Sequence, residues 1–550
     1  MMGLSNYLIF FVVGLSQAIP NASNPAKAIL EQAINALGGA SALGNIEDVT
    51  YRGAEIYRSR STAESFALTG VDNSVSSVGV QNVTFSFHDG QLTQRIDRRH
   101  QMGPYWTWAR PVLNPIDMSL VIRDGDDGYA AVVEGSYSLF APGAPPSGPL
   151  DGLLAAYLIN EATKMSPLLL NKVLLGNNYR LKQETFTSGA RRTAIHDKSL
   201  NISIILDKDT ALPHIVRSYE NHPFWGPSTR DYVLQSYTTV EGVKFPRRFK
   251  TVYNDDRVVE DFSVADVLVN TNPDVSYSTP RVKAIMPPTR DNEYDFAEIG
   301  ELFTPHTWGG AYRGTLANLS AINPYPDLPG VWLLIFEDAE TYRQMVYEFD
   351  DFVVVLDAPP HQSHLVIQWV KETLKKPLKY VWPSHHHHDH AFGVRDYVAA
   401  GAKVIALDFA VDYYSTISDK SFATYSSDEP FVLSDSKMRV TFAHMKHSIH
   451  AEDYSYALAY PTHGSKNSTV IIFDADHSNP TTGLSPNDQT LLFGALGDYA
   501  RHRVPLSSIY VSGHGDRTEF KKLPEAAGFL YPNYTLEDYK YWKRGPIGNH

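Results

Sequence analysis

Cysteine is absent from all 550 residues of this chain. The chain therefore forms no disulfide and offers no thiolate, so any bound metal ion must be held by histidine and carboxylate side chains. Basic residues are also outnumbered, with 48 Lys and Arg against 61 Asp and Glu and a formal net charge of −13. Nucleic-acid binding needs a basic surface to meet the phosphates, so we expect no nucleic-acid partner.

Apolar runs long enough to cross a membrane are also lacking, so we expect no membrane span. Residues 7–15 form a short apolar run that ends in Ser16, Gln17 and Ala18, with small residues at the −3 and −1 positions of a cleavage site after Ala18. This pattern predicts a secretory signal over residues 1–18. No Lys or Arg precedes the run, since the first is Lys27, and a buried N-terminal helix is the alternative.

The sequence contains several N-x-S/T sequons, which are acceptors for N-glycosylation and support secretion. The six sequon asparagines are Asn21, Asn82, Asn201, Asn318, Asn467 and Asn533. We therefore expect an extracellular glycoprotein.

A chain of 550 residues is too long for one ordinary core, and 43% apolar residues suit a well-packed protein of two or more domains. After a short helix opening at Pro25, residues 24–272 show alternating patterns and turn signals that predict a mostly antiparallel β domain. Residues 273–330 are rich in Pro, Asn and Asp and are predicted to be a linker or wrapping segment. From Val331 strands alternate with helices, which predicts a separate domain over 331–550.

Residues 384–390 read Ser-His-His-His-His-Asp-His, an internal run of five histidines and one aspartate. Imidazole nitrogens and carboxylates are the ligands of zinc and similar divalent cations, and histidine-rich tracts are typical of metal binding. A purification tag would be terminal and uninterrupted, and a solvated loop would carry Lys, Glu and Ser. Read as H-x-H-x-D-H, the run predicts a metal site with the candidate ligands His385, His387, Asp389 and His390.

Further candidate ligands stand at the ends of predicted strands, where layered α/β folds place their chemistry. Asp476 and His514 each follow a short apolar strand. Three histidines spaced by three residues precede a later strand, and these are His444, His447 and His450.

These motifs together resemble the metallo-β-lactamase-fold hydrolase superfamily over residues 330–518. The H-x-H-x-D-H loop of that family matches 385–390, the strand closing on an aspartate matches Asp357, and its last histidine, in a G-H-G setting, matches His514. Ala475 stands where the family commonly has glycine. The resemblance implies an α+β/αβ chain whose residues 331–550 form a four-layer αβ/βα sandwich with a metal site at one edge.

The resemblance also implies ligands for two divalent metal ions, zinc first, with iron or manganese as alternatives. They are His385, His387 and His450 for one ion, Asp389, His390 and His514 for the second, and Asp476 as the bridge between them. His447 is the alternative to His450, while His386 and His388 would point away from the ions. Asp474 and His477 flank the bridging position and could support it.

Two cations so held would lower the pKa of a shared water, so that metal-bound hydroxide exists near neutral pH, and would polarise a scissile carbonyl. Asp389 is the predicted catalytic residue, because it can orient the nucleophile. No G-x-S-x-G nucleophile motif is present. We therefore expect a secreted metal-dependent hydrolase that cleaves an ester, lactone or related carbonyl bond of a small molecule, with a phosphodiesterase as the alternative within the same fold.

A different class of function also remains open. Segments such as Leu206–Pro213 and Gly242–Arg247 loosely resemble lipoprotein-carrier-like β modules. That resemblance implies a secreted protein that binds an apolar ligand and uses its metal structurally. Structural zinc sites are normally closed cages of four ligands, so seven candidate ligands favour the enzyme.

Overall fold

The structure is a computed structural model that describes residues 25–60, 76–102, 116–135, 148–273, 314–464, 468–478 and 486–532, together with Leu68, 275–277 and Phe296. Within these ranges it leaves out Asp151, Asp338, Glu340, Thr341, Ile449, Asp516 and Phe529. The predicted signal segment 1–18 lies outside the described residues. Among the helices of the described part, none is both long and apolar enough to cross a membrane.

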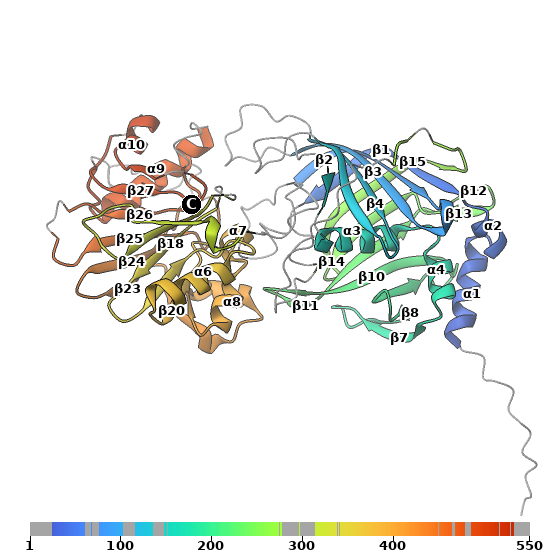
Figure 1. Cartoon of the computed structure of the whole chain (residues 1–550), viewed down its shortest axis with the longest axis horizontal. Coiled ribbons are helices and arrows are strands. Elements are labelled where there is room, and N and C mark those ends of the chain that lie inside the picture. Colours follow the sequence, from blue (N-terminus) through green and yellow to red (C-terminus); the bar gives the residue numbers. More distant parts are fainter. Residues whose placement is uncertain are drawn as a thin grey trace, which may run out of the picture.

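The N-terminal half is one large curved sheet, seen in the blue-to-green part of Figure 1. Its thirteen strands pair in the order β6-β5-β4-β3-β2-β1-β15-β14-β11-β10-β9-β8-β7, and the neighbouring strands run antiparallel, which confirms the predicted antiparallel β domain. The strands are β1 (Asp48–Arg60), β2 (Ser76–Ser86), β3 (Thr93–Met102), β4 (Ile116–Arg123), β5 (Tyr129–Gly135), β6 (Gly148–Pro149), β7 (Tyr179–Thr185), β8 (Arg191–Asp197), β9 (Ile202–Leu206), β10 (Pro213–His222), β11 (Gly226–Gln235), β14 (Arg248–Tyr253) and β15 (Arg257–Val269). A separate short hairpin joins β12 (Thr238–Val240) to β13 (Val243–Phe245).

Helices pack against the inner side of this sheet. They are α1 (Pro25–Leu37), α2 (Ala40–Gly44), α3 (Gly152–Met165) and α4 (Leu169–Gly176). The sequence predicts α1, whose proline stands in the first turn. It does not predict α3 and α4, because a continuous apolar run has no periodicity that separates a buried helix from a buried strand. Apolar side chains of α1, α3 and α4 join those of the sheet in one core, and Figure 1 shows the sheet curving around α3.

The C-terminal half contains two sheets. The seven-stranded sheet has the order β16-β17-β18-β19-β20-β21-β22, and the six-stranded sheet has the order β23-β24-β25-β26-β27-β28. The first comprises β16 (Leu319–Ile322), β17 (Val331–Phe336), β18 (Arg343–Glu348), β19 (Val353–Leu356), β20 (Leu378–Trp382), β21 (Lys403–Leu407) and β22 (Phe422–Tyr425). The second comprises β23 (Phe431–Ser434), β24 (Met438–His444), β25 (Ser455–Pro461), β26 (Ile471–Phe473), β27 (Ile509–Val511) and β28 (Thr518–Glu519).

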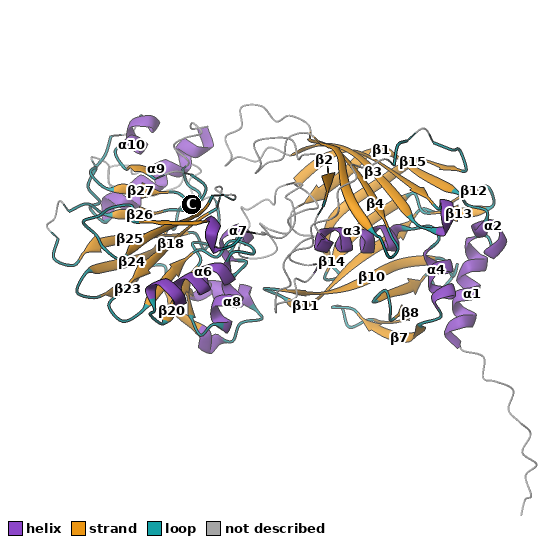
Figure 2. Ribbon diagram, in the orientation of Figure 1, coloured by secondary structure: helices purple, strands orange, loops and turns teal. Residues whose placement is uncertain are grey.

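The two sheets of the C-terminal half face each other, with helices on their outer sides. Buried side chains of both sheets, such as Trp382, Phe442 and Phe473, form the core between them. One outer side is covered by α6 (Ser363–Trp369), its π-helical extension η3 (Val370–Leu374) and α8 (Val394–Ala399). The other is covered by α9 (Pro486–Arg501) and α10 (Lys522–Ala527). Figure 2 shows the two pairs of helices on opposite sides of the sheets.

The seven-stranded sheet begins earlier than the sequence indicates. Its first strand, β16, pairs antiparallel with β17 and lies inside the segment 273–330 that is predicted to be a linker. Because β16 has only four residues and each is partly exposed, it lacks the buried apolar run that marks β17 in the sequence.

The β10–β11 hairpin joins the two halves. Its tip places Phe224, 1% exposed, in the core of the C-terminal half, with its ring centroid 5.4 Å from that of Tyr413. The backbone carbonyl of Phe224 accepts hydrogen bonds from the amide of Thr416 at 3.1 Å and from the hydroxyl of Ser415 at 2.9 Å. The N-terminal half therefore contributes an aromatic residue to the fold of its neighbour.

Candidate metal centre

Strand direction brings the candidate ligands to one place. Parallel neighbours β19 and β20 end at the same edge of their sheet, so Asp357 and the histidine loop lie side by side. Parallel neighbours β26 and β27 end together in the other sheet, where they present Asp476 and His514. The antiparallel strand β25 begins at that same edge, and His450 comes shortly before it.

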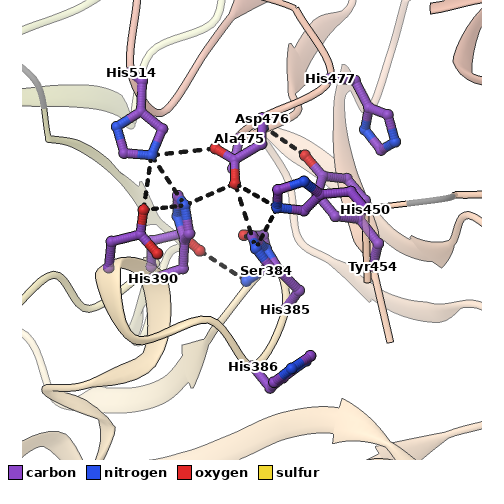
Figure 3. A network of polar contacts seen from close by, with 12 residues as sticks. Ser384, His385, His386, His390, His450, Tyr454, Ala475, Asp476, His477 and His514 are labelled. Atoms are coloured by element: carbon purple, nitrogen blue, oxygen red, sulfur yellow. Dashed lines mark hydrogen bonds and ion pairs between the residues drawn. The ribbon is translucent and has the colours of Figure 1, made fainter. Parts of the chain in front are cut away.

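All seven candidate ligands gather into two buried groups. The first contains His385, His387, His450 and Asp476, and the second contains Asp389, His390 and His514. Within each group one nitrogen or oxygen atom of every residue lies within 4.8 Å of the others. Figure 3 shows five of these side chains converging, namely His385, His390, His450, Asp476 and His514. Asp389 and His390 belong to the short helix α7 (His388–Ala391). Residues up to 129 positions apart in the sequence are thus brought together.

Asp476 contacts both groups. One of its carboxylate oxygens, Oδ2, lies 3.3 Å from the Nε2 atom of His385 and 3.0 Å from that of His450. The same oxygen lies 3.1 Å from the Nε2 atom of His390, and Oδ1 lies 3.2 Å from that of His514. A single carboxylate is therefore shared between the two groups, which is the arrangement expected of a bridging ligand.

Imidazole nitrogens also face each other directly. The Nε2 atoms of His385 and His450 are 3.1 Å apart, and those of His390 and His514 are 3.2 Å apart. Two neutral imidazoles cannot both point lone pairs at each other without a proton or a cation between them. The geometry therefore suits positive charge at the centre of each group.

Hydrogen bonds on the far side of the rings fix this orientation. The Nδ1 atom of His390 lies 2.8 Å from a carboxylate oxygen of Asp357, and the Nδ1 atom of His385 lies 3.1 Å from the hydroxyl of Ser384. A ring that donates from Nδ1 keeps a lone pair on Nε2, the atom that faces the group. Asp357 itself has a φ of 61° and also accepts the amide of Ser384 at 2.7 Å.

The two histidines predicted to point away are buried and bonded elsewhere. The Nδ1 atom of His386 lies 2.7 Å from Asp453. The Nε2 atom of His388 lies 2.9 Å from the hydroxyl of Tyr413, and its ring centroid lies 4.7 Å from that of Phe224 at the hairpin tip. These spacers thus anchor the loop to the surrounding structure.

Burial and neighbouring charges shift the pKa values in the groups. Burial lowers the pKa of His385 well below its ordinary range, and the adjacent imidazoles lower it further. Burial alone would also lower the pKa of His514, but the carboxylates of Asp476 and Asp389 raise it to about 9. Despite burial, the facing histidines hold the pKa of both carboxyl groups well below the ordinary range. At His514 the carboxylates thus outweigh burial and favour the protonated ring, and a bound cation would displace that proton.

The structure distinguishes the three histidines that precede β25. His450, 1% exposed, is a member of the first group. His447 is exposed, and His444 uses its ring nitrogens on the hydroxyl of Ser427 at 3.0 Å and the carbonyl of Glu452 at 2.8 Å. The geometry favours His450 for the group.

Tyr454 is a neighbour of the site that the sequence does not reveal. Its hydroxyl accepts the amide of Asp476 at 2.6 Å and donates to Asp474 at 2.5 Å. Asp474 also receives a hydrogen bond from the ring of His477 at 2.9 Å. Asp474 and His477 thus support the loop of Asp476 rather than joining the groups. A tyrosine at the start of a strand gives no motif by which this role could be found.

The side chain of Asp389 is 10% exposed, against 4% for His514 and 3% for Asp476. An ionised carboxylate in this position can orient a nucleophile by hydrogen bonding.

Comparison with solved structures finds similar folds among metallo-β-lactamases. One from Pontibacter korlensis covers 39% of this chain and 100% of its own, with 16% identity and a TM-score of 0.29. One from Hirschia baltica covers 38% of this chain and 96% of its own, with 16% identity and a TM-score of 0.28. A third, from Pseudomonas aeruginosa in a mono-zinc form, covers 38% and 93%, also with 16% identity and a TM-score of 0.28.

The sequence itself matches no protein-family model and no curated protein. Nothing among these structures supports the carrier-like resemblance of the N-terminal half, which stays a prediction.

Proposed function

We propose that the C-terminal half is a metal-dependent hydrolase whose site takes two divalent cations. The observation that carries this proposal is the pair of buried groups that share Asp476. Five imidazoles and two carboxylates fit zinc, iron or manganese in their donor chemistry, and zinc is the first choice. A structural site would need only four ligands in a closed cage.

Cations bound here would supply Lewis acidity, which activates a water and polarises the bond to be cleaved. His385, His387 and His450 would hold one cation, Asp389, His390 and His514 the other, and Asp476 both. Asp357 keeps the Nε2 lone pair of His390 directed inward through its hydrogen bond to Nδ1. Asp389 would orient the attacking water, because it is ionised and its side chain is not fully buried.

We further propose that the two facing sheets and their outer helices are the four-layer αβ/βα sandwich implied by the motifs. The three buried cores support it, one between the sheets and one beneath the helices on each outer side. In such a fold a site at the sheet edges is rigidly held, since every ligand lies in a loop or short helix adjoining the end of a strand.

Small-molecule esters and lactones are the proposed substrates, with phosphodiesters second. The proposal rests on the chemistry of the site, because an activated water attacks carbonyl carbon and phosphorus alike. A panel of esters, lactones and phosphodiesters, assayed with metal-reconstituted protein, will rank the two classes.

We also propose that the protein is secreted and N-glycosylated. Of the three sequons within the described residues, Asn201 is exposed at a turn with a φ of 51°. Asn82 and Asn318 instead use their amide oxygens on backbone amides, at 3.0 Å and 2.9 Å. Asn201 is therefore the sequon best placed to carry a glycan, which mass spectrometry of protein from a eukaryotic host will test.

Metal content and activity together test the enzyme. We expect about two equivalents of divalent metal per chain, from the two groups, and loss of hydrolysis on chelation with recovery when metal is restored. A single tightly held ion with no turnover of any substrate in the panel would contradict the proposal.

Replacing Asp389 tests the assignment of roles. Asp389→Ala removes one ligand and the orienting carboxylate, so turnover should fall by more than about 100-fold, since loss of a group that merely supports a ligand already costs about 10–100-fold. The N-terminal sheet should stay folded. Asp498→Asn is the matched control, because Asp498 is a buried aspartate of the same half outside both groups. Equal activity of Asp389→Ala and the unaltered protein would refute the role.

A further inference from the structure

Ser448 lies two residues before the candidate ligand His450 and is partly exposed. Its hydroxyl oxygen accepts a hydrogen bond from the backbone amide of His450 at 3.1 Å. The same oxygen lies 3.0 Å from the Nε2 atom of His477. Ser448 therefore links the loop of His450 to the loop that carries His477 and Asp476.

Asp474 is the centre of the contacts on that second loop, and it is 0% exposed. Its Oδ1 atom lies 2.9 Å from the Nδ1 atom of His477 and accepts the hydroxyl of Tyr454 at 2.5 Å, while Oδ2 accepts the hydroxyl of Tyr499. The hydroxyl of Tyr454 in turn accepts the backbone amide of Asp476 at 2.6 Å. A continuous chain of hydrogen bonds thus joins two candidate ligands, in the order His450, Ser448, His477, Asp474, Tyr454 and Asp476.

The direction of each hydrogen bond in this chain follows from the donors available. A carboxylate only accepts, so the Nδ1 atom of His477 donates to Asp474 and the Nε2 atom keeps its lone pair. The hydroxyl of Ser448 donates to that lone pair and keeps its own lone pairs for the amide of His450. In the other tautomer of His477 a lone pair would face the carboxylate. The chain therefore fits one protonation pattern, which fixes the position of both loops.

A serine, a histidine and an aspartate in this order also occur in nucleophilic triads. Here, however, the serine oxygen is already engaged by the amide of His450. The aspartate is not the end of the chain either, because Tyr454 continues it to Asp476. Both ends of the chain thus reach backbone amides of candidate ligands, which favours positioning of those ligands over attack on a substrate.

The second group has a different support. Asp357 lies 2.8 Å from the Nδ1 atom of His390 and accepts the amide of Ser384 at 2.7 Å. His390 belongs to the group of Asp389 and His514, whereas His450 belongs to the other group. Asp357 and Ser448 therefore hold ligands of different groups.

We propose that Ser448, His477, Asp474 and Tyr454 are positioning residues that set the separation of His450 and Asp476, and that Ser448 thereby tunes the affinity for one of the two cations alone. The proposal rests on the two-cation site proposed above. Loss of the Ser448 end should weaken only the cation that His450 holds. Loss of the Tyr454 end should weaken both, because Asp476 contacts both groups.

Calorimetric titration of the metal-free full chain with Zn²⁺ tests the proposal. Fewer than two equivalents bound by the unaltered protein would contradict the proposed function before any variant is compared. In Ser448→Ala we expect one equivalent with unchanged affinity and one weakened about tenfold, the lower end for a group that supports a ligand. Two equivalents with unchanged affinity, or equal weakening of both, would overturn the proposal.

Ser508→Ala is the matched control. Ser508 is 0% exposed, and its oxygen accepts the backbone amide of Val470 at 3.2 Å, just before strands β26 and β27 begin and thus at their opposite ends from the site. This variant loses the same kind of hydrogen bond and should bind both equivalents of Zn²⁺ unchanged. If Ser448→Ala lowered the melting temperature of the metal-free protein without weakening either equivalent, its role would be structural only, and the proposal would fail.

Tyr454→Phe tests the other end of the chain. It removes the hydroxyl that accepts the amide of Asp476, so the affinity for both equivalents of Zn²⁺ should fall. Tyr347→Phe is its control, since the hydroxyl of Tyr347 is equally buried and has no hydrogen-bond partner among the described residues. Equal affinities in the two variants would show that the chain does not position Asp476.

A double variant decides whether Ser448 and Asp357 act on different cations. Asp357→Asn leaves one acceptor oxygen for two donors, so it should weaken the equivalent held by His390. Ser448→Ala and Asp357→Asn should each keep one tight equivalent, and their combination should keep none. One tight equivalent in the double variant would mean that both residues act on the same cation, which would overturn the proposal. Should the double variant fail to fold, the comparison of Ser448→Ala with Ser508→Ala decides alone.

A fluorophosphonate probe tests the triad alternative on the metal-free protein. We expect no covalent labelling of Ser448, measured by mass spectrometry of its peptides. Labelling of Ser448 that His477→Gln abolishes would show an activated nucleophile, and would overturn the assignment of Ser448 as a positioning residue.

Discussion

The two halves of this protein both bury polar and charged side chains, but they satisfy them differently. In the N-terminal sheet, the guanidinium of Arg217 donates twice to Asp231 at 2.8 Å and also contacts Asp255. In the C-terminal half, five imidazoles and two carboxylates meet with nitrogen facing nitrogen. The first arrangement is complete by itself. The second becomes complete only when cations, or protons in their place, lie between the rings.

The difference separates a cluster whose charges are satisfied within the protein from one whose nitrogen atoms are not. A buried ion pair with matched geometry needs nothing from solution, so its contribution should not depend on any ligand. A group whose lone pairs all point at one place is satisfied only when a cation is bound there. Burial alone does not distinguish the two, because Arg217 is 1% exposed and His385 is also 1% exposed.

The largest expected effect comes from breaking the complete cluster. Arg217→Met would leave Asp231 and Asp255 without their cation, and Glu184 with Lys182 alone, which should lower the free energy of unfolding by about 3–5 kcal/mol. Hydrogen–deuterium exchange should place the loss in the N-terminal sheet and show it equally with and without metal. Arg248→Met, which removes a 42% exposed partner of Asp261, is the control and should cost less than about 1 kcal/mol. If metal restored the protection from hydrogen exchange that Arg217→Met loses, the ion-pair cluster would depend on a ligand, and the contrast between the two clusters would be wrong.

A smaller effect is expected at the junction of the two halves. Phe224→Ala removes the ring that packs against His388 and Tyr413, which should lower the free energy of unfolding by about 3 kcal/mol. Because His388 is part of the histidine loop, metal affinity should also fall, by about 10-fold or more as for other groups that support ligands. Metal titration and calorimetry check both. Phe409→Ala, at a 38% exposed phenylalanine of the C-terminal half, should change neither. Unchanged metal affinity in Phe224→Ala would show that the contact between the two halves does not influence metal binding.

The smallest effect concerns a buried carboxyl that belongs to neither kind of cluster. Burial raises the pKa of Asp498 to about 6, and Arg501 offsets this in part. Between about pH 4 and pH 6 the unfolded chain releases this proton before the folded one does, so the free energy of unfolding falls as pH rises through that window. Asp498→Asn removes this dependence and should be more stable than the unaltered protein at pH 7 by about 1–2 kcal/mol, with the advantage lost at pH 4. Thermal unfolding across that pH range measures it, and Asp408→Asn, an exposed site, should show no such crossing.

The sequence predicts those parts of the structure that local patterns encode. Short apolar runs predict strands over Leu378–Trp382, Lys403–Leu407 and Ile509–Val511, and β20, β21 and β27 have these bounds, because turn residues set the ends of each run. Helices α3 and α4 are not predicted, since an apolar run fits a buried strand as well as a buried helix. The seven candidate ligands follow from the resemblance of their motifs to those of metallo-β-lactamase-fold hydrolases. The supports of the site do not, because Asp453 and Tyr454 meet it through pairing between distant strands.

The insertion of Phe224 into the other half is the clearest case of what sequence cannot show. Nothing in the segment 222–226 sets it apart from other aromatic turns, and its role depends on the socket formed by residues far along the chain. Tertiary contacts of this kind have no local signature.

The burial of the histidine run has a practical consequence for handling the protein. The four consecutive histidines 385–388 are at most 2% exposed. The rings of His386 and His388 are bonded to Asp453 and Tyr413 inside the fold. A sequence that reads like an affinity tag is therefore hidden from a nickel resin while the chain is native, and becomes available when the chain unfolds. Retention on such a column in the absence of denaturant would report damaged material, so a simple chromatographic step could be used to remove it from a preparation.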